Sequence, residues 1–418
     1  MTNSSATDRK GRPRVAVTGI GVKTPAGNDV ATFWQGLAAG ESKAATLTRF
    51  DPSPLPVRFG CEVHDFDPVD YLGPKEARRL DRVTQLGFAA AADALGDAGD
   101  ASVDPARSAV VIGTGIGGLI TLEEQVNVYR EKGAARVSPF FVPMMMTNAT
   151  AGTIAMQFGW TGPNVCIATA CAASAHAIGE GARLLRDGSA DVVIAGGTEA
   201  CMTPTAISAF ARMTALSGRN DDPEHASRPF DAARDGFVMG EGAAILILER
   251  WDRAVARGAK IYGEVAGYGR NADAYHITAP SPGGEGAAAC MQLALDDAGL
   301  DASEVGHVNA HGTSTPLNDA AEAEAIRKVF GDGAPPVTST KGVTGHLIGA
   351  AGATEAVACV LGFEHRAIPP TANLEQLGDD IQLDVVAGAA RPLDPTPALS
   401  NSFGFGGHNV SLIFVPPS

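Results

Sequence analysis

The chain carries the same order of elements twice, and this repetition limits the folds open to it more than any other feature of its sequence. In each half an apolar strand ends in glycine, a second strand runs into a glycine-rich turn, and a third leads through a turn into a helix of small residues. The corresponding pairs are 15–21 with 264–269, 108–118 with 305–312, and the segment around Cys171 with 337–351. Identity between the halves is too low for a short solenoid repeat, which favours one strand–helix unit used twice. Two such units packed back to back predict a layered α/β body whose corresponding turns converge at the middle.

The composition fits such a body and excludes some functions. With 418 residues the chain is long enough for two or three ordinary domains, or for one duplicated domain. Its 32 Lys and Arg against 47 Asp and Glu give a net charge of -15. Since a phosphate-binding surface needs a basic face, this charge argues against nucleic acid as the main partner. It leaves room for a small basic patch that binds an acidic protein.

Apolar periodicity places the main elements along the chain. Strands are expected at 14–21, 108–112, 191–197 and 243–248, and helices at 30–39, 75–97 and 176–185. Gly40 is expected to end the first helix. Segment 46–71 is rich in Pro, Asp and Phe, which predicts an ordered surface excursion, and the charged crossing 227–237 is expected to be tied down by its Arg and Asp residues.

Cys171 lies where an apolar run gives way to small residues and then to the helical stretch 176–185. A helix N-terminus carries unpaired N–H groups and partial positive charge, so a thiol there is expected to be biased toward the nucleophilic thiolate. The small neighbours Ala170, Ala172 and Ala173 would let a second backbone or a thioester approach closely. A buried structural cysteine is the alternative interpretation.

The other cysteines and the N-terminus bear on the compartment. The six cysteines have no paired CxxC spacing, so the sequence predicts reduced thiols and neither a zinc motif nor a redox motif. Residues 1–13 are polar and basic, without the apolar core of a signal peptide, and no later stretch has the apolar length of a membrane span. We therefore expect a cytoplasmic protein with a flexible leader and no membrane association.

Gly113, Gly115 and Gly118 satisfy the GxGxxG pattern of dinucleotide sites. That pattern needs a prompt second strand ending in an acidic residue, and the chain continues instead through a long helical and loop stretch. We therefore interpret these glycines as positions of close backbone packing beside the central site.

Polar residues gather at the corresponding turns of the second half. His311 follows a buried strand, and His346 lies just after Lys341 at the start of a small-residue helix. Either histidine alone would be read as a satisfied core residue, but with Cys171 they form a constellation that suits acyl transfer. Neutral imidazoles donate hydrogen bonds to an enolate or move protons, and a thiolate carries an acyl group. The glycine- and aromatic-rich segment 401–409 would bring backbone N–H groups and a gating ring to a ligand, or would be a purely structural turn.

A run of basic residues is unusual in so acidic a chain. Lys75, Arg78, Arg79 and Arg82 crowd the first turns of the helix expected at 75–97. This face is either a docking patch for a partner or a solvated helix surface.

Several of these motifs together resemble one enzyme family. They are Ala170-Cys171, 227–231, 308–316, 339–341 with 344–346, and 401–407. The chain is similar to the β-ketoacyl-[acyl-carrier-protein] synthases of the thiolase superfamily, and within them to the synthase II group of bacterial type II fatty-acid synthesis. The similarity runs from about Arg14 to the C-terminus.

The resemblance implies a thiolase-like α/β fold with two pseudo-symmetric halves in a five-layered α-β-α-β-α arrangement. The implied division is a leader at 1–13, an N-terminal half at 14–255 with the nucleophile, and a C-terminal half at 256–418 with the two histidines and the lysine. It also implies a homodimer in which the strand at 163–169 pairs across a two-fold axis, with residues 140–157 packed on it.

The resemblance further implies a ping-pong mechanism. An acyl chain moves from acyl carrier protein to Cys171, malonyl-carrier protein loses CO₂ with help from His311 and His346, and the carbanion attacks the thioester in a Claisen condensation. The backbone N–H groups of Cys171 and Phe403 would form the oxyanion hole, and Lys341 would set the electrostatics around His311. Further positions match an acidic support (Glu355), pantetheine or malonyl contacts (Thr278, Thr313, Thr315), the acyl pocket (Ile116, Phe210) and carrier docking (Lys75, Arg78, Arg79, Arg136). No metal and no cofactor are implied, because the carrier protein supplies the phosphopantetheine.

Two departures from the family pattern concern substrate preference. Cys171 is followed by Ala-Ala-Ser where Thr-Gly or Ser-Gly is common, and His408 stands where Thr is common. An aromatic-polyketide ketosynthase and a non-catalytic subunit of the chain-length-factor type are the alternatives. The presence of Cys171 argues against the second, which resembles this family with the nucleophile replaced.

Overall fold

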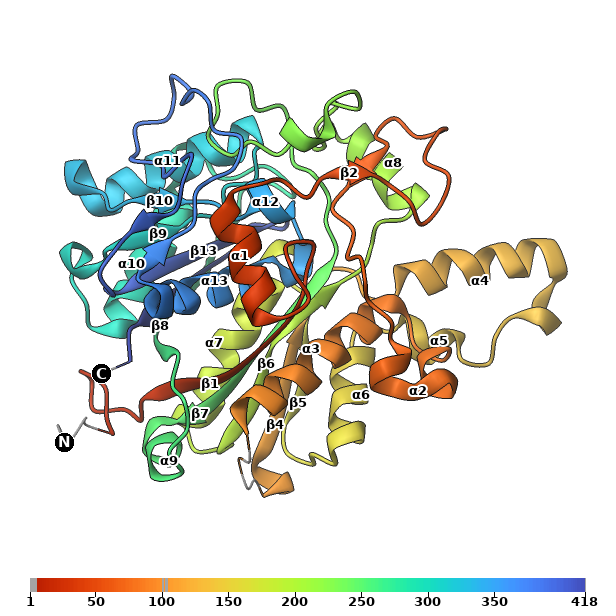
Figure 1. The fold of residues 1–418 in the computed structure, drawn as a ribbon, viewed down its shortest axis with the longest axis horizontal. Coiled ribbons are helices and arrows are strands. Elements are labelled where there is room, and N and C mark those ends of the chain that lie inside the picture. The colour runs from red at the N-terminus through yellow and green to blue at the C-terminus, as the bar shows by residue number, and fades with distance from the viewer. Residues whose placement is uncertain (1–5, 100, 102–103, 418) are drawn as a thin grey trace.

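The computed structural model describes residues 6–99, 101 and 104–417, and a ten-stranded mixed sheet runs through this part of the chain (Figure 1). The strand order is β10-β9-β13-β14-β8-β1-β7-β6-β4-β5. The first half supplies β1 (Val15–Lys23), β4 (Ser108–Gly113), β5 (Asn164–Ile167), β6 (Val192–Glu199) and β7 (Gly242–Arg250). The second half supplies β8 (Gly263–Ala272), β9 (His307–Asn309), β10 (Val337–Thr338), β13 (Ala398–Gly404) and β14 (His408–Val415). Two small ribbons, β2 (Ala45–Thr46) with β3 (Phe59–Gly60) and β11 (Ala367–Ile368) with β12 (Arg391–Pro392), lie outside it.

The two halves of the sheet have the same topology. Each half contributes five strands, which can be ranked in chain order. From the outer edge of the sheet inward, both halves have the order third, second, fourth, fifth, first. In both halves the first two of these pairings are parallel and the last two antiparallel. The halves meet where β1 and β8 pair at Ala16 with Glu264 and at Val17 with Gly263. The repetition read from the sequence is therefore confirmed strand by strand.

Helices form three layers around the two halves of the sheet. The middle layer holds α7 (Ala173–Arg186) and α13 (Ala351–His365), which pack on each other and on strands of both halves. One outer layer holds α3 (Arg82–Ala98) and α6 (Ala149–Phe158), and the other holds α10 (Glu285–Ala298) and α11 (Pro316–Phe330). This is the expected α-β-α-β-α arrangement. The remaining α-helices are α1 (Val30–Ala39), α2 (Val69–Ala77), α4 (Leu119–Lys132), α5 (Phe141–Met145), α8 (Pro204–Arg212), α9 (Trp251–Ala256) and α12 (Lys341–Thr344).

Small residues make the middle layer thin enough for both halves to reach it. A Cβ on Gly352 of α13 would lie 2.8 Å from the Cβ of Ala175 on α7, and one on Gly179 would lie 2.4 Å from the ring of Tyr268. Because real Cβ atoms do not approach so closely, glycine is required at both positions. The N-terminal ends of α7 and α13, and the turns that precede them, therefore lie close together at the centre of the molecule.

Of two helices predicted in the N-terminal half, one is confirmed and the other is wrong. The helix predicted at 30–39 is α1, which begins with a capping box at Asp29 and ends at Gly40 with φ 67°. The single helix predicted at 75–97 is wrong, because Asp81 caps a new helix, accepting a hydrogen bond from the Val83 N–H. Arg82 then turns inward and pairs with the buried Glu241 at 2.7 Å, so it does not belong to a surface patch.

The structure describes residues 6–13 of the predicted leader, whose flexibility stays a prediction. Arg12 pairs with Asp297 at 2.5 Å, and Arg9 pairs with Glu304 at 2.7 Å, so residues 6–13 pack on the C-terminal half. Residues 1–5 lie outside the described residues. The boundary near residue 255 stays a prediction.

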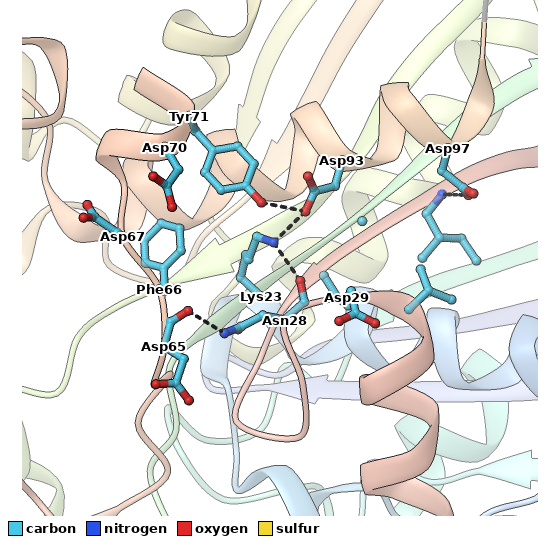
Figure 2. Close-up of a pocket in the computed structure, with 14 residues that line it drawn as sticks. Lys23, Asn28, Asp29, Asp65, Phe66, Asp67, Asp70, Tyr71, Asp93 and Asp97 are labelled. Carbon is cyan, nitrogen blue, oxygen red and sulfur yellow. Dashed lines mark hydrogen bonds and ion pairs between the residues drawn. The ribbon is translucent and has the colours of Figure 1, made fainter. Parts of the chain in front are cut away.

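A cavity of about 490 Å³ lies between β1, α3 and the segment 65–71 (Figure 2). The buried Lys23 amino group is 2.5 Å from an Asp93 carboxylate oxygen, which also accepts a hydrogen bond from the Tyr71 hydroxyl at 3.2 Å. The lysine thus has its counter-ion within the cluster, and its contacts tie β1 to α3. No lining residue of this cavity is shared with the catalytic cavity described below. Within the described residues, no helix is long and apolar enough to cross a membrane.

Candidate active site

A cavity of about 630 Å³ opens where the turns of the two halves converge. Nine residues singled out from the sequence line it: Ile116, Cys171, Phe210, Thr278, His311, Thr313, Thr315, His346 and Phe403. Lys341 lies directly behind it, in contact with His311, and Glu355 lies behind Lys341 and pairs with it. The tertiary structure therefore brings together positions that are spread over nearly 300 residues of the chain.

The nucleophile and the two histidines form a tight cluster. One ligand-type atom each from Cys171, His311 and His346 lies within 4.8 Å of the other two, and all three residues are buried. The imidazole rings meet edge to face, with centroids 5.3 Å apart. Among the described residues this is the one Cys, His, Asp and Glu cluster with metal-ligand spacing, but the positive charge of Lys341 beside His311 disfavours a cation there.

Cys171 sits on a strained turn between β5 and α7. Ala170, directly before it, has φ 49°, which is unusual for a residue with a Cβ. A short 3-10 turn at Ala170–Ala172 leads into the helix, so the thiol lies at its start as predicted. The glycine-rich loop closes against this turn, since a Cβ on Gly404 would lie 2.6 Å from the Thr169 carbonyl oxygen.

The predicted bias of Cys171 toward the thiolate is wrong for the substrate-free protein. Burial raises the pKa of the Cys171 thiol to about 11, because a desolvated thiolate is costly. The charge of Lys341 and a hydrogen bond from the Phe405 backbone lower this pKa, but by less. The sulfur must therefore lose its proton when it attacks. His346 is able to take that proton, because it lies in the same cluster and its ring nitrogens have no hydrogen-bond partner among the described residues.

Both histidines are held neutral. Burial, followed by the charge of Lys341, keeps the pKa of His311 and of His346 well below the ordinary value. The Lys341 amino group lies 3.3 Å from His311 Nδ1, and since an ammonium only donates, Nδ1 accepts and Nε2 carries the proton. Neither ring nitrogen of His346 has a hydrogen-bond partner among the described residues, so both are available to a substrate. Behind them, Lys341 forms a buried ion pair with Glu355, whose pKa burial raises to about 7.

The glycine-rich loop presents two aromatic residues to the site. The ring of Phe403 packs against His311, with centroids 5.8 Å apart. The backbone groups that hydrogen-bond to the Cys171 sulfur belong to Phe405, two residues later, and to Cys171 itself. The oxyanion role of Phe403 stays a prediction, and Phe405 is an addition that the sequence motif alone did not single out.

Two buried carboxylates that sequence reasoning missed hold the catalytic turns. Glu322 accepts hydrogen bonds from the backbone N–H groups of His311 at 2.8 Å and Gly312 at 2.7 Å. Glu199 accepts from Gly115 N–H at 2.6 Å and Gly349 N–H at 3.1 Å, so it joins turns of the two halves. Neither carboxylate falls in a motif with a known chemical spacing, which is why the sequence did not reveal them.

The GxGxxG glycines pack closely, as interpreted from the sequence. A Cβ on Gly113 would lie 2.3 Å from the Ala173 carbonyl carbon, and one on Gly118 would lie 2.3 Å from the Met144 carbonyl oxygen. A Cβ on Gly115 would meet a Glu199 oxygen at 2.7 Å. All three glycines thus allow close backbone packing, and Gly115 also lines the catalytic cavity.

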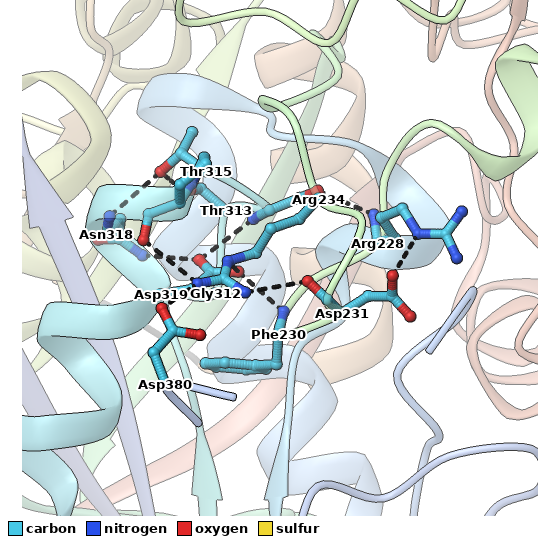
Figure 3. Close-up of polar contacts among 12 residues, drawn as sticks. Arg228, Phe230, Asp231, Arg234, Gly312, Thr313, Thr315, Asn318, Asp319 and Asp380 are labelled. Carbon is cyan, nitrogen blue, oxygen red and sulfur yellow. Dashed lines mark hydrogen bonds and ion pairs between the residues drawn. The ribbon is translucent and has the colours of Figure 1, made fainter. Parts of the chain in front are cut away.

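Hydrogen bonds to Asp319 support the segment that carries Thr313 and Thr315. Figure 3 shows Asp319 beneath them, where it accepts hydrogen bonds from the Phe230 N–H at 2.8 Å and the Ser314 N–H at 3.2 Å. Both donors are left-handed, with φ 66° at Phe230 and 72° at Ser314, so one carboxylate holds two strained residues. Arg228 and Asp231, 2.8 Å apart, tie down the neighbouring crossing, as predicted.

The predicted docking residues lie outside the cavity. Lys75, Arg78 and Arg136 are exposed. Arg79 lies over the ring of Phe140 at 4.7 Å, which holds it against the segment that precedes α5. These four positions stay a predicted patch, and Arg82 is removed from it.

Comparisons with known proteins agree with this geometry. Residues 12–254 match the family "Beta-ketoacyl synthase, N-terminal domain", and residues 262–375 match "Beta-ketoacyl synthase, C-terminal domain". The chain is 51% identical over 409 residues to "3-oxoacyl-[acyl-carrier-protein] synthase 2" of Synechocystis sp., which covers 96% of this chain and 98% of that protein. Among solved structures, "The ishigamide ketosynthase/chain length factor" superposes with a TM-score of 0.92 at 35% identity, covering 97% of this chain and 100% of that one. The "type II PKS acyl-carrier protein in complex with its ketosynthase" (AntDE:AntF) gives a TM-score of 0.88 at 31% identity, with coverage of 97% and 100%.

Proposed function

This chain belongs to the β-ketoacyl synthase family, and from that premise we propose how its residues divide the reaction. The protein is a decarboxylative condensing enzyme of fatty-acid synthesis that extends a carrier-bound acyl chain by two carbons, as a 3-oxoacyl-[acyl-carrier-protein] synthase II does. The observation that carries the division of labour is the meeting of Cys171 from one half with His311 and His346 from the other, within 4.8 Å.

The first half-reaction loads Cys171. Its sulfur attacks the acyl thioester, the new S–C bond forms, the bond to the carrier's sulfur breaks, and the thiol proton passes through a neutral imidazole to the departing carrier thiol. Backbone N–H groups of Cys171 and of the glycine-rich loop, at Phe403 or Phe405, stabilise the oxyanion.

The second half-reaction uses the histidines. The C–C bond to the malonyl carboxylate breaks, CO₂ leaves, and the electron pair stays on the donor as an enolate that accepts hydrogen bonds from His311 Nε2 and His346. The Lys341 contact holds the required tautomer of His311. The enolate carbon then bonds to the acyl carbon, the bond to Cys171 breaks, and the released thiolate takes up a proton from solvent.

Two substitutions test this division. Cys171→Gln should abolish condensation, because no thioester can form, and should leave CO₂ release from malonyl-carrier protein undiminished or raised. His311→Ala should permit slow acylation and suppress CO₂ release by a factor on the order of 10². Labelled acyl transfer and CO₂ release are followed separately. The proposal fails if the Gln variant loses decarboxylation while the His311 variant keeps it.

The partner and substrate contacts follow from the same premise. An acidic carrier protein would be steered by Lys75, Arg78, Arg79 and Arg136, and its phosphopantetheine would pass Thr278, Thr313 and Thr315. Ile116 and Phe210 line the cavity beside Cys171, where they would limit acyl length.

A homodimer would cover an exposed apolar face. The edge strand β5 and the neighbouring helices expose Val142 (58%), Met156 (76%) and Val165 (44%), and β5 pairs with β4 alone among the described strands. Figure 1 shows α4 projecting beside this face. An unpaired, apolar sheet edge favours pairing with a second copy. Light scattering at micromolar concentration should therefore give the mass of a dimer, and a monomer would contradict it.

A further inference from the structure

His176 and His408 lie behind the nucleophile turn and have no role in the steps above. His176 is on α7, five residues after Cys171, and His408 is the first residue of β14. Their imidazole rings meet edge to face, with centroids 6.4 Å apart and an interplanar angle of 86°.

His176 bridges the two ends of the strained turn. Its Nδ1 lies 2.9 Å from the Thr169 hydroxyl oxygen and 3.2 Å from the Ala172 carbonyl oxygen. A carbonyl oxygen only accepts, so Nδ1 carries the proton in that contact. Thr169 and Ala172 flank Ala170, the residue held at φ 49°. The imidazole therefore supports the backbone that sets the position of Cys171.

His408 packs against the glycine-rich loop that faces the Cys171 turn. A Cβ on Gly406, which has φ 88°, would lie 3.1 Å from His408 Cδ2 and 3.2 Å from its Nε2, so the ring lies directly against this glycine. Gly404 of the same loop lies against the Thr169 carbonyl oxygen. The loop thus touches the nucleophile turn directly at Gly404 and indirectly through the two imidazoles.

The charged groups near the pair meet at one carboxylate, that of Glu180. The Tyr268 ring faces His176 edge-on at 6.3 Å, and its hydroxyl donates to Glu180 at 3.1 Å. Arg270 and Arg183 lie 3.3 Å and 3.2 Å from the same carboxylate. Burial, and to a smaller extent His408, lowers the pKa of His176, which favours the neutral imidazole.

We propose that His176 and His408 are a pair of positioning residues that hold the turn bearing Cys171 in register with the loop 403–407. Acyl transfer uses backbone N–H groups from both segments, whereas decarboxylation uses the imidazoles of the C-terminal half. The pair should therefore affect the first half-reaction and spare the second. This inference rests on the proposed function for the identity of the two half-reactions.

The experiment compares His176→Ala, His176→Asn and Thr169→Val. Readouts are the rate of Cys171 alkylation by iodoacetamide, the acyl-transfer rate, and CO₂ release measured in the Cys171→Gln background. His176→Ala and Thr169→Val should each slow acyl transfer roughly tenfold, and the double variant should be no slower than either. Alkylation should slow as well, because a displaced sulfur loses the Phe405 hydrogen bond that favours the thiolate. His176→Asn, whose amide can donate in place of Nδ1, should restore most of both rates.

The role of His408 is tested by combining its substitution with His176→Ala in a double variant. His408→Ala should slow acyl transfer about threefold on its own and add little to His176→Ala, as expected for an aromatic contact. The matched control is His225→Ala, at an exposed histidine that pairs with Asp222, and it should change none of the rates.

Three results would overturn the proposal: equal losses in acyl transfer and CO₂ release, additive effects of the paired substitutions, or no rescue by asparagine. Alkylation requires no carrier protein. Suppose that the wild-type protein does not condense acyl and malonyl substrates, but the alkylation rates of the variants follow the expected pattern. The proposed function would then be contradicted, and the positioning pair would still be supported.

Discussion

Replacing Glu199 by glutamine should stabilise the protein at alkaline pH and leave its stability unchanged in mild acid. Glu199 is 0% exposed and accepts hydrogen bonds from Gly115 N–H, Gly349 N–H and the Thr114 hydroxyl. No Lys, Arg or His within the described part of the chain forms an ion pair with it. Burial therefore raises its pKa from the ordinary 4.5 to about 7.

The sign and size of the effect follow from this shift. The folded protein holds the Glu199 proton more tightly than the unfolded chain, so ionisation costs nothing below pH 4.5 and its full cost is reached above pH 7. The shift corresponds to about 3 kcal/mol of unfolding free energy. Glutamine avoids this cost, because its amide oxygen can accept from Gly115 and Gly349 while its NH₂ group donates to the Thr114 oxygen.

Thermal unfolding between pH 5 and pH 8.5 tests this reasoning. The midpoint of Glu199→Gln should be closest to that of the wild type at pH 5, and the difference should grow up to about pH 7. The matched control is Glu241→Gln, at an equally buried carboxylate that pairs with Arg49 and Arg82, each at 2.7 Å. That variant should be destabilised at pH 8.5, since it removes the buried negative charge that pairs with the partly exposed Arg49 and Arg82. A Glu199→Gln effect that is destabilising or independent of pH would refute the argument.

Three further predictions concern activity. Reversing Arg78 and Arg79 to Glu should raise the KM for carrier-bound substrates severalfold and leave turnover of a small acyl-thioester analogue nearly unchanged, because the patch acts on encounter with the carrier; equal losses would make the patch structural. Ile116→Phe should cost long acyl primers about 1–3 kcal/mol of transition-state stabilisation and short primers less, measured as kcat/KM over a primer series; a uniform loss would show that Ile116 supports the fold instead. Alkylation of Cys171 in the substrate-free protein should rise about tenfold per pH unit from pH 6 to pH 9, since the thiolate fraction grows toward a pKa of about 11; a plateau below pH 8 would contradict a buried, protonated thiol.

Local patterns in the sequence were sufficient for the fold class and for most of the site. Apolar strands and glycine turns recur in the same order in both halves, and strands of equal rank take equal places in the sheet. Cys171, His311 and His346 could be found because each follows such a strand at a turn, and equivalent turns converge when the halves pack together. The helix at 30–39 was also predictable, because Asp29 and Gly40 mark its ends locally.

Contacts between distant residues were decided only by the tertiary structure. Desolvation raises the pKa of Cys171 and reverses the thiolate bias expected from its helix start, and that desolvation comes from the packing of both halves around it. Arg82 looked like a surface charge until Glu241, 159 residues away, was placed beside it. Glu199 likewise meets Gly349 across 150 residues. Periodicity records which face of an element is buried, whereas a pKa or a hydrogen-bond partner depends on what the rest of the chain brings to that face.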